Sequence, residues 1–598
     1  MDYLLRMFVV FHRGRVALAG LILLTGAGCS LLRPPPRVSI ETDAPLSRSS
    51  RANLQLLASV EDVLMEEDIN EELLRLAIRA DEQAMNRYLR AQGFYDASVS
   101  VEITERKNLP HAVFTIHPGP EYQFDRAVVT GLPPDVAAPP ERPAGTTRAS
   151  SSAVLADRGA ALRHLRESGY PEARVTHQEI VVDHATREVT ATFEVDPGPF
   201  TTMGRLRAEG LKDLRSSYVR KAKTWQEGVP YDIRKVELLE RRLAGSGLFA
   251  AIQTRRDAEG ADAPEENRYD VLLTLRERRP RTLQLGIGYR TDTGAETSAQ
   301  WQHRNALGGG ENFITRVKLS EEGYEADTRI IVPFFRRPDQ QWGTSVTVRE
   351  EDPDAYKTRA VEGETWLSRE INRYLTLRAG AALHYLNESQ NQDRDSFFLA
   401  SLPLRALYDH SNNRLDATRG YRLVGQAEPF QGINDSDLFF WRNLGTVSGF
   451  LPLRDDDAIS VAVRVTVGGI TGDSVSAIPA ESRFYAGGGQ SVRGYAYQSL
   501  SPRNEEGEII GGLSLLESSL EVRGRLGSSL GLAVFLDGGT AFAERIADFR
   551  ESYRWGAGAG IRYFTPVGPL RFDAGMPLDR REGIDSSWQF YVSIGQAF

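Results

Sequence analysis

The charged residues whose types and spacing suggest a specific interaction are Arg493 and Asp537. Arg493 lies in a glycine-rich stretch at residues 483–502, RFYAGGGQSVRGYAYQSLSP. Asp537 lies in an alternating segment, which places its side chain on the same face as Ala533 and Phe535. A guanidinium group binds a carboxylate through two parallel hydrogen bonds and keeps its charge. We therefore predict an ion pair that holds the glycine-rich stretch in place.

The segments around this stretch alternate with a period of two residues. Valines alternate with small or polar residues over 461–467, and leucine and valine alternate with polar residues over 516–523. Strands with charges on one face and apolar residues on the other are typical of a transmembrane β-barrel, with lipid outside and water inside. Residues 483–502 are therefore predicted to be a long loop between two barrel strands. Over 532–537, the leucines and Val534 would face lipid, and Asp537 would face the lumen.

No catalytic motif accompanies the pair. The sequence has no phosphate loop, no Gly-x-Ser-x-Gly elbow and no His-Glu-x-x-His helix. It has one cysteine and nine scattered histidines, so we predict no metal, no cofactor and no enzyme activity. The glycine–alanine run at 556–560 leads into a strand, so we interpret it as small residues that line a crowded lumen.

The N-terminus has the features of a secretory signal. Basic residues precede a short apolar run, and small residues and Cys29 follow it, so residues 1–29 are predicted to be a signal sequence. The sequence is compatible with lipidation of Cys29 and with ordinary cleavage. Residues 30–50 are rich in proline, arginine and serine and are predicted to be a linker. The net charge of −9 argues against a nucleic-acid partner.

A repeat follows the linker. Gly93, Gly169 and Gly247 each end a helical pattern, at intervals of roughly 77 residues, and such a period indicates an array of one unit. Each unit is predicted to run strand, helix, helix, strand, strand. In the third unit the predicted elements are a strand at 203–208, helices at 214–225 and 232–243, and a hairpin of 250–255 with 269–275.

Residues 280–598 have a different character. Six of the seven tryptophans lie there, as expected for the aromatic girdles of a barrel. At roughly 20 residues per strand and connection, this region predicts about sixteen antiparallel strands.

These motifs resemble those of the outer-membrane assembly superfamily that includes BamA and TamA. The stretch Val492, Arg493, Gly494 and Tyr495 matches its VRGY loop motif, and Phe535, Asp537 and Gly538 match its partner motif. The resemblance implies that the loop folds back into the lumen.

The repeats resemble POTRA domains, which handle unfolded chains in the periplasm of such proteins. The boundaries this implies are 51–120 for the first, with its first strand near 37–42, 121–199 for the second and 200–279 for the third. Three repeats resemble the TamA branch more than the BamA branch, which has five.

The first and last barrel strands are predicted to form a weak seam. Two inward glycines weaken the first strand, and Gly595 with Gln596 weakens the last. The residues assigned to the first strand of the seam are Leu283, Leu285, Gly286, Ile287, Gly288 and Tyr289, and those assigned to the last are Phe590, Val592, Ile594, Gly595 and Phe598.

The function that the resemblance implies is assembly of other proteins in the bacterial outer membrane. Its clients would be unfolded outer-membrane proteins, autotransporters among them, and its other partners would be outer-membrane lipid and a TamB-like inner-membrane protein. The alternatives are a BamA-like general insertase, a two-partner secretion transporter and a passive porin. A porin fits poorly, because porins have no periplasmic repeat array.

Overall fold

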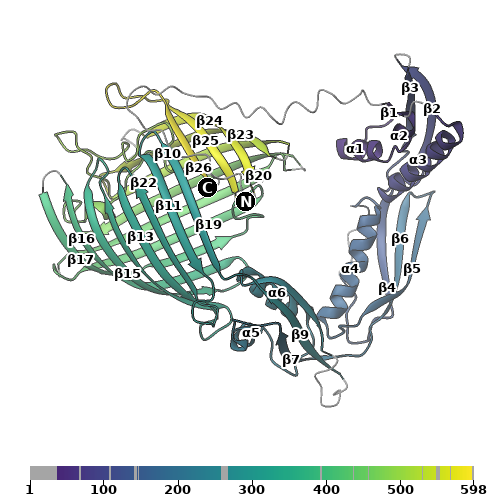
Figure 1. Ribbon diagram of the computed structural model, residues 1–598, viewed down its shortest axis with the longest axis horizontal. Helices are drawn as coiled ribbons and strands as arrows, with labels where there is room; N and C mark the ends of the chain where they lie inside the picture. The colour runs from purple at the N-terminus through teal and green to yellow at the C-terminus, as the bar shows by residue number, and fades with distance from the viewer. Residues whose placement is uncertain are drawn as a thin grey trace, which may run out of the picture. The chain divides into compact units, whose positions relative to one another are not determined.

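The structure is a computed structural model (Figure 1). It describes residues 37–594 except 66–68, 107–108, 140–144, 146, 258–266, 391–392, 436, 455–456, 528, 547–552 and 566–567. The predicted signal sequence with Cys29, and Gly595 and Phe598 of the predicted seam, lie outside the described residues. The chain divides into two compact units, Met1–Phe200 and Thr201–Phe598.

The first compact unit contains two α+β repeats, each with a three-stranded sheet. Strand order is β1-β3-β2 in repeat 1 and β4-β6-β5 in repeat 2, with one parallel and one antiparallel pairing in each sheet. The elements of repeat 1 are β1 (Val38–Thr42), α1 (Arg48–Leu56), α2 (Val60–Leu64), α3 (Glu71–Ala91), β2 (Ser98–Arg106) and β3 (Leu109–His117). The elements of repeat 2 are β4 (Gln123–Thr130), α4 (Ser151–Glu167), β5 (Arg174–Asp183) and β6 (Glu188–Asp196).

Repeat 3 opens the second compact unit. Its elements are β7 (Thr202–Glu209), α5 (Ser216–Ala222), α6 (Ile233–Gly245), β8 (Phe249–Arg256) and β9 (Arg268–Glu277), with sheet order β7-β9-β8. Asp232 caps α6, and Val236, Leu239 and Leu243 lie buried on one face of that helix. They pack against buried residues of β9 in a core that belongs to this repeat.

The glycines that mark the repeats share one backbone conformation and one position, at the end of a helix. Gly93, Gly169 and Gly247 follow α3, α4 and α6 with φ of 93°, 106° and 68°. This left-handed region is open to glycine at little cost, so each glycine ends its helix and turns the chain into the next strand.

Three sequence predictions in this region were wrong. Repeat 1 has three helices, α1, α2 and α3, instead of two. The interval 30–50 was predicted to be a linker apart from a first strand near 37–42; that strand is present as β1, but the interval also contains the start of α1, where the Ser47 side chain accepts a hydrogen bond from the Ser50 N–H. Repeat 2 has one helix, α4, in its described residues instead of two. Proline is frequent at 133–143, and it removes backbone donors and restricts the residue before it, which disfavours a helix there.

Repeat 3 contacts one end of the barrel. Arg215 N–H donates to Gly308 O at 2.8 Å, and Asn305 Nδ2 donates to Asp213 O at 3.0 Å. The Tyr218 and Phe334 rings lie 5.0 Å apart. Residues 304–311 and Phe334, which lie in two connections between barrel strands, thus hold this repeat against the barrel.

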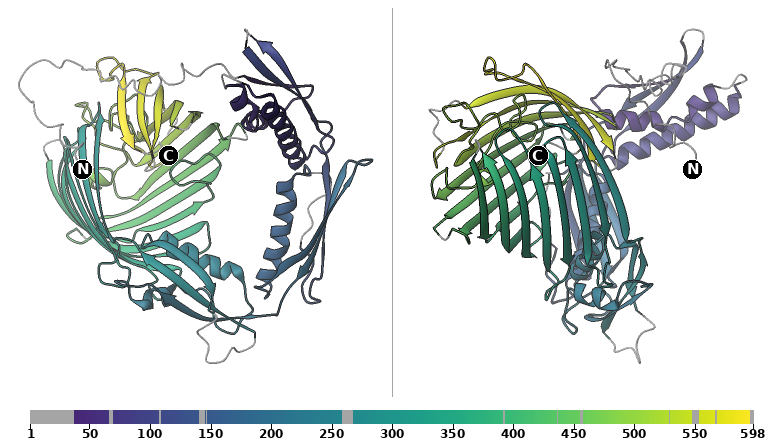
Figure 2. Two further views of the ribbon diagram at one scale, coloured as in Figure 1. Left: turned by 45° about the vertical axis from the view of Figure 1, so that its right-hand side comes forward. Right: turned by 60° about the vertical axis from the view of Figure 1, so that its left-hand side comes forward.

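The remaining strands form a closed antiparallel barrel (Figures 1 and 2). Its strands are β10 (Arg281–Arg290), β11 (Gly294–His303), β12 (Asn312–Ser320), β13 (Gly323–Val332), β14 (Gln340–Glu351), β15 (Lys357–Glu370), β16 (Leu375–Gln390), β17 (Asp393–Ser401), β18 (Leu404–Asp409), β19 (Gly420–Gly432), β20 (Phe439–Pro452), β21 (Ile459–Gly472), β22 (Ser514–Leu526), β23 (Leu530–Phe542), β24 (Arg554–Thr565), β25 (Gly568–Pro577) and β26 (Gln589–Ile594).

Segments β17 and β18 are two halves of one strand. Both pair with β16 on one side and with β19 on the other. Pro403 lies at the break, and proline has no N–H to donate to a ladder. The barrel therefore has sixteen strands, as predicted.

The predicted alternation holds in the strands around the glycine-rich loop. Val463, Val465 and Val467 are exposed on the outer face, whereas Glu521 and Asp537 are buried inside. Trp366 departs from the expected aromatic girdle, because it faces inward and is 7% exposed, with the Arg378 guanidinium 4.0 Å from its ring centroid. No helix among the described residues is long and apolar enough to span a bilayer.

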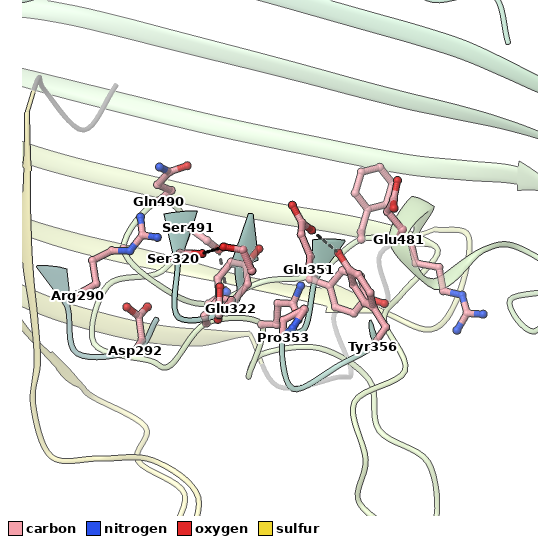
Figure 3. Close-up of a pocket in the computed structure, with 18 of the residues that line it drawn as sticks. Arg290, Asp292, Ser320, Glu322, Glu351, Pro353, Tyr356, Glu481, Gln490 and Ser491 are labelled. Carbon is pink, nitrogen blue, oxygen red and sulfur yellow. Dashed lines mark hydrogen bonds between the residues drawn. The ribbon is translucent and has the colours of Figure 1, made fainter. Parts of the chain in front are cut away.

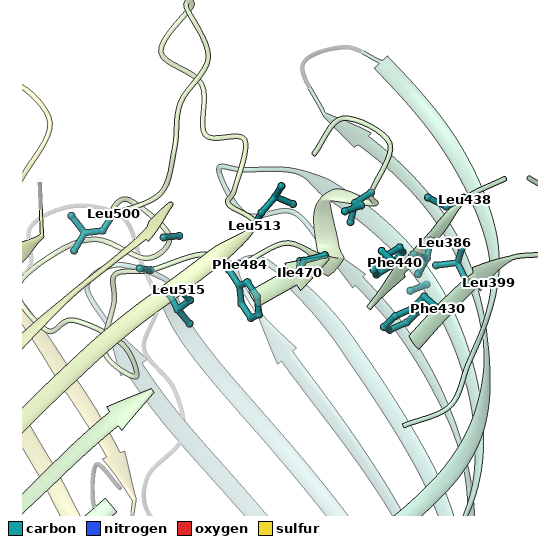
Figure 4. Packing of buried hydrophobic residues seen from close by; sticks show 14 of the residues in the cluster. Leu386, Leu399, Phe430, Leu438, Phe440, Ile470, Phe484, Leu500, Leu513 and Leu515 are labelled. Carbon is teal, nitrogen blue, oxygen red and sulfur yellow. The ribbon is translucent and has the colours of Figure 1, made fainter. Parts of the chain in front are cut away.

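The loop between β21 and β22 forms an apolar core inside the barrel (Figure 4). Phe484 and Leu500 of the loop belong to one buried cluster with Leu399, Phe430 and Phe440 of the barrel wall. The lumen at this level is therefore packed with side chains.

Candidate functional site

Arg493 lies at the centre of a buried charged site. Its Nε donates to Asp537 Oδ2 at 2.6 Å and its Nη2 donates to Asp537 Oδ1 at 3.0 Å, which is the bidentate geometry expected from the sequence. The backbone N–H of Arg493 also donates to Asp537 Oδ2 at 3.2 Å. One carboxylate on β23 thus fixes both the side chain and the backbone of the loop.

Two further carboxylates complete the coordination of Arg493. Its Nη1 lies 2.9 Å from Glu521 Oε2 on β22 and 3.2 Å from Asp573 Oδ2 on β25. Sequence reasoning missed both, because which residues of different strands meet depends on register and on the curvature of the wall. The alternation around Glu521 did place it on the inner face, and this was the one signal available.

Three more arginines balance these carboxylates. Arg523 Nε donates to Glu521 at 2.7 Å, Arg571 Nε lies 3.1 Å from Asp573 Oδ2, and Arg562 forms ion pairs with both Glu521 and Asp573. Four guanidinium groups therefore share three carboxylates across β22 to β25. We call these seven residues, Arg493, Arg523, Arg562, Arg571, Glu521, Asp537 and Asp573, the charge network.

The charge network is dry, contrary to the expectation of a water-filled lumen. The side chains of Arg493 and Asp537 are 2% and 1% exposed. Phe535 covers the guanidinium, with its ring centroid 3.4 Å from Arg493 Cζ. The apolar part of the loop and the inward aromatic residue exclude solvent, so breaking the ion pair carries the cost of a stranded buried charge.

The other residues of the loop motif seat it against the C-terminal strands. Val492 is fully buried in the apolar core of the loop. Tyr495 donates from its hydroxyl to Trp555 O at 3.0 Å. Gly494 has φ of 103°, and a Cβ there would lie 2.7 Å from the Met576 backbone. Only glycine allows the loop to approach β25 so closely.

Glycines on β24, the wall strand opposite the motif, leave room for the loop. A Cβ on Gly556 of β24 would lie 2.1 Å from Arg493 O, and a Cβ on Gly560 would lie 1.9 Å from Asp573 Oδ1. The predicted interpretation of 556–560 as small residues in a crowded lumen is therefore confirmed. Gly538 of the partner motif faces outward, where the Trp555 ring would meet its Cβ at 2.7 Å.

A second anchor of the loop was not predicted. Glu388 of β16 accepts hydrogen bonds from the N–H groups of Ala480 at 2.7 Å and Glu481 at 3.3 Å. Arg483, 8% exposed, donates to Ile478 O and Ile510 O within the loop and to Gln390 of β16. No sequence motif marked these residues, because the contact joins positions far apart in the chain.

A cavity of about 470 Å³ lies between the loop and the turns of the first strands (Figure 3). Arg290, Asp292 and Glu322 line it from the side of the first strands, and Gln490 and Ser491 line it from the loop. The loop is thus packed tightly on β22 to β25 and more loosely toward β10 and β12.

Among the described residues, the ladder between β10 and β26 at the predicted seam is two residue pairs long. Tyr289 pairs with Val592 and Arg290 with Tyr591, whereas β10 pairs with β11 along its whole length from Arg281 to Arg290. The Thr291 N–H adds a bond to Phe590 O at 3.1 Å.

The seam residues of β10, and Phe590 of β26, lie on the faces that the alternation predicts. On β10, Leu283, Leu285, Ile287 and Tyr289 are exposed on the outer face, and Gly286 and Gly288 occupy the alternate positions. On β26, Phe590 is 52% exposed, and Ile594 pairs with Leu570 of β25.

Comparison with known proteins agrees with this architecture. Residues 305–598 match the Omp85 superfamily domain. Outer membrane protein assembly factor BamA of Neisseria meningitidis serogroup B (strain ATCC BAA-335 / MC58) is 22% identical over 597 residues, which cover 87% of this chain and 72% of that protein. BamA of Nitratidesulfovibrio vulgaris (strain Hildenborough) is 23% identical over 425 residues, covering 69% of this chain and 53% of that protein.

A solved structure shares the fold. BamA from Haemophilus ducreyi lacking POTRA domains 1–3 aligns with a TM-score of 0.59 at 17% identity, covering 80% of this chain and 100% of that one. The three N-terminal repeats are therefore described as POTRA domains, which lie in the periplasm in front of a barrel in the outer membrane. Residues 305–598 thus match the Omp85 superfamily domain, and most of the chain is similar in sequence to BamA.

Proposed function

We propose that this protein assembles other proteins in the outer membrane. In this proposal the POTRA domains receive unfolded clients in the periplasm, and the barrel inserts or translocates them. The Omp85 superfamily domain and the homology to BamA support this class of function. This function depends on noncovalent interactions, so no covalent bond of the client needs to be made or broken.

The observation that carries the proposal is the short pairing at the seam. Over the described residues, the ladder of β10 with β26 joins Tyr289 to Val592 and Arg290 to Tyr591, whereas the ladder of β10 with β11 runs from Arg281 to Arg290. In the proposal the ladder with β26 opens. Backbone N–H and C=O groups that face lipid without partners cost several kcal/mol each, so the edge of β10 that opening exposes favours pairing with an incoming strand. A client strand that adds to β10 satisfies those groups.

The POTRA sheets supply further edges. Strands β2, β5 and β8 each lie at one edge of their sheet. Ile180 and Val181 of β5 are 42% and 53% exposed, which adds apolar surface to one of these edges. An extended client can bond to such an edge through its backbone, without a requirement for one sequence.

The packed lumen argues against a passive porin. The charge network and the apolar core of the loop fill the barrel between β16 and β25 with buried side chains. A porin needs a water-filled path through its strands.

The finer assignment that we propose is a TamA-like factor for autotransporters and related clients, with a TamB-like inner-membrane partner. The three POTRA sheets found in the described residues support it over a five-POTRA insertase. The alternatives are a BamA-like general insertase and a two-partner secretion transporter.

Depletion of the protein, followed by quantitative proteomics of the outer membrane, tests these alternatives. A TamA-like role predicts loss of autotransporters with most barrels unchanged. A general insertase predicts loss of nearly all barrels and arrest of growth. An unchanged outer-membrane proteome in verified depleted cells would contradict the proposal. Re-expression of the intact chain is the control.

A further inference from the structure

Tyr591 of the last strand contacts the lumenal loop directly. Its side chain is 1% exposed on the inner face of β26. The Gly494 N–H donates to its hydroxyl oxygen at 3.1 Å, and the hydroxyl donates to Tyr495 O at 3.4 Å. Its ring also lies against Gly489, where a Cβ would meet Tyr591 Cδ1 at 2.7 Å. The ring is thus bounded by two separate parts of the loop.

The loop that Tyr591 contacts is anchored to other strands. Arg493, next to Gly494, is held by Glu521 of β22, Asp537 of β23 and Asp573 of β25. None of these strands is at the seam. The segment around Gly494 therefore stays with the C-terminal wall when the edge of the barrel moves.

The last strand has unequal support on its two edges. Along β25 it pairs over Gln589–Ile594, whereas among the described residues its ladder with β10 joins Tyr591 and Val592, and Thr291 bonds Phe590 beyond that ladder. On the side of β10 the loop faces the cavity lined by Arg290 and Asp292 (Figure 3). The contacts that restrain β26 from the inside are therefore those of Tyr591 with the loop.

We propose that Tyr591 is a positioning residue that couples the closed seam to the seated loop. Movement of β26 away from β10 breaks its hydrogen bonds to Gly494 and Tyr495, because Arg493 prevents the loop from following. Closure of the seam restores those bonds. The inference rests on the proposed lateral seam and adds to it an internal restraint supplied by the loop.

The test is the open-to-closed ratio of the seam in Tyr591→Phe. This substitution removes the hydroxyl and keeps the ring, so the packing against Gly489 is retained. Spin labels on Ile287→Cys and Phe590→Cys, in a Cys29→Ser background, report the distance between β10 and β26 by pulsed electron paramagnetic resonance in nanodiscs. Both labelled positions are exposed on the outer face.

Tyr591→Phe is expected to raise the open-to-closed ratio about 2- to 10-fold, the factor that loss of an ordinary hydrogen bond gives. Tyr563→Phe on β24 is the matched control, because Tyr563 is 48% exposed on the outer face. In an Arg493→Ala background, where the loop is no longer anchored, Tyr591→Phe should have a smaller effect.

Two results would overturn the inference. One is an unchanged ratio in Tyr591→Phe, and the other is an equal increase with and without Arg493. The proposed function fails by a different observation, namely client assembly at the normal level while the seam is locked by a disulfide. The distance measurement and the assembly measurement therefore separate the two.

Discussion

At the scale of single residues, Arg493 joins three strands through one side chain. Asp537 receives both the fork of the guanidinium and the backbone N–H of Arg493, so the loop is fixed at the main chain as well as at the side chain. Removing the guanidinium takes from Asp537 the salt bridge that Arg493 supplies, since Arg523, Arg562 and Arg571 pair with Glu521 and Asp573. The residue is thus an anchor for the loop.

Arg493→Ala is expected to destabilise the folded barrel by about 3–5 kcal/mol, the usual cost of breaking a buried ion pair. Arg493→Lys should lose less, because the charge remains while the bidentate geometry is lost. The measurement is the free energy of unfolding in denaturant, together with protease cleavage within residues 483–502.

Arg359→Ala is the control for that experiment. Arg359 pairs with Glu350 at 3.1 Å, but its side chain is 68% exposed, so solvent screens the pair and its loss should leave the stability nearly unchanged. Equal stability of Arg493→Ala and Arg359→Ala would show that the charge network does not anchor the loop.

Glu277 is the comparable residue in the periplasm. Its carboxylate accepts the N–H groups of Lys212, Asp213 and Leu214 at 2.8, 3.1 and 3.1 Å. Burial opposes ionisation, but these backbone bonds outweigh it and hold the pKa of Glu277 below its ordinary value. Because Asp213 O accepts from Asn305 of the barrel, Glu277 supports the junction between POTRA 3 and the barrel.

Glu277→Gln should therefore weaken POTRA 3 by about 1–3 kcal/mol near neutral pH. A carboxyl group with a lowered folded pKa adds stability above its unfolded pKa of about 4.3, and this stability is lost as pH falls toward the folded pKa. Thermal melts of both forms between pH 7 and pH 3 should converge at low pH. A constant difference across this range would contradict the assignment.

At the scale of elements, the sequence predicted the features that follow from the spacing of apolar and polar side chains along the chain. Lipid on one side and polar groups on the other impose strict alternation, so the inner position of Asp537 and the outer positions of Val463 and Val534 followed from sequence. The elements of repeat 3 followed from the helical period and from Gly247. These features depend on neighbours along the chain.

Contacts between distant strands were not predictable in this way. The bonds of Arg493 to Glu521 and Asp573, and of Glu388 to Ala480, depend on how the wall curves and how the loop folds back. The inward Trp366 also escaped prediction, because composition places aromatic residues in the barrel without assigning a face. The described residues of repeat 2 do not form the predicted first helix, because proline is frequent there, and the repeat pattern alone did not take account of those prolines.

The POTRA domains are expected to fold without the barrel. Each repeat has its own buried core, and that of POTRA 3 joins α5, α6 and its sheet. Residues 37–279 expressed alone should be soluble, with mixed α and β circular dichroism and a cooperative melt. Residues 37–200 serve as the comparison, because POTRA 3 in the longer segment has lost its contacts with the barrel. An unfolded or insoluble product of the longer segment would contradict the expectation.

At the scale of the whole molecule, the barrel is held unevenly around its circumference. The lumenal loop binds β14 to β16 through Glu481 and Glu388, and it binds β22 to β25 through Arg493. The strands β10 and β26 meet over a short ladder between these two supports. In the proposed function, the wall is held where the loop is anchored and separates at the seam, which is what insertion of a client strand requires.

The most direct test of this account is client assembly with the seam locked by a disulfide. Tyr289 and Val592 are paired across the seam, so cysteines at both positions, in a Cys29→Ser background, can be joined by oxidation. Val317 and Ala326, paired between β12 and β13, give a matched control lock away from the seam. The account predicts that oxidation of the Tyr289→Cys, Val592→Cys protein stops assembly of client barrels, that reduction restores it, and that the control lock has no effect. Assembly by the locked seam at the level of the control would contradict it.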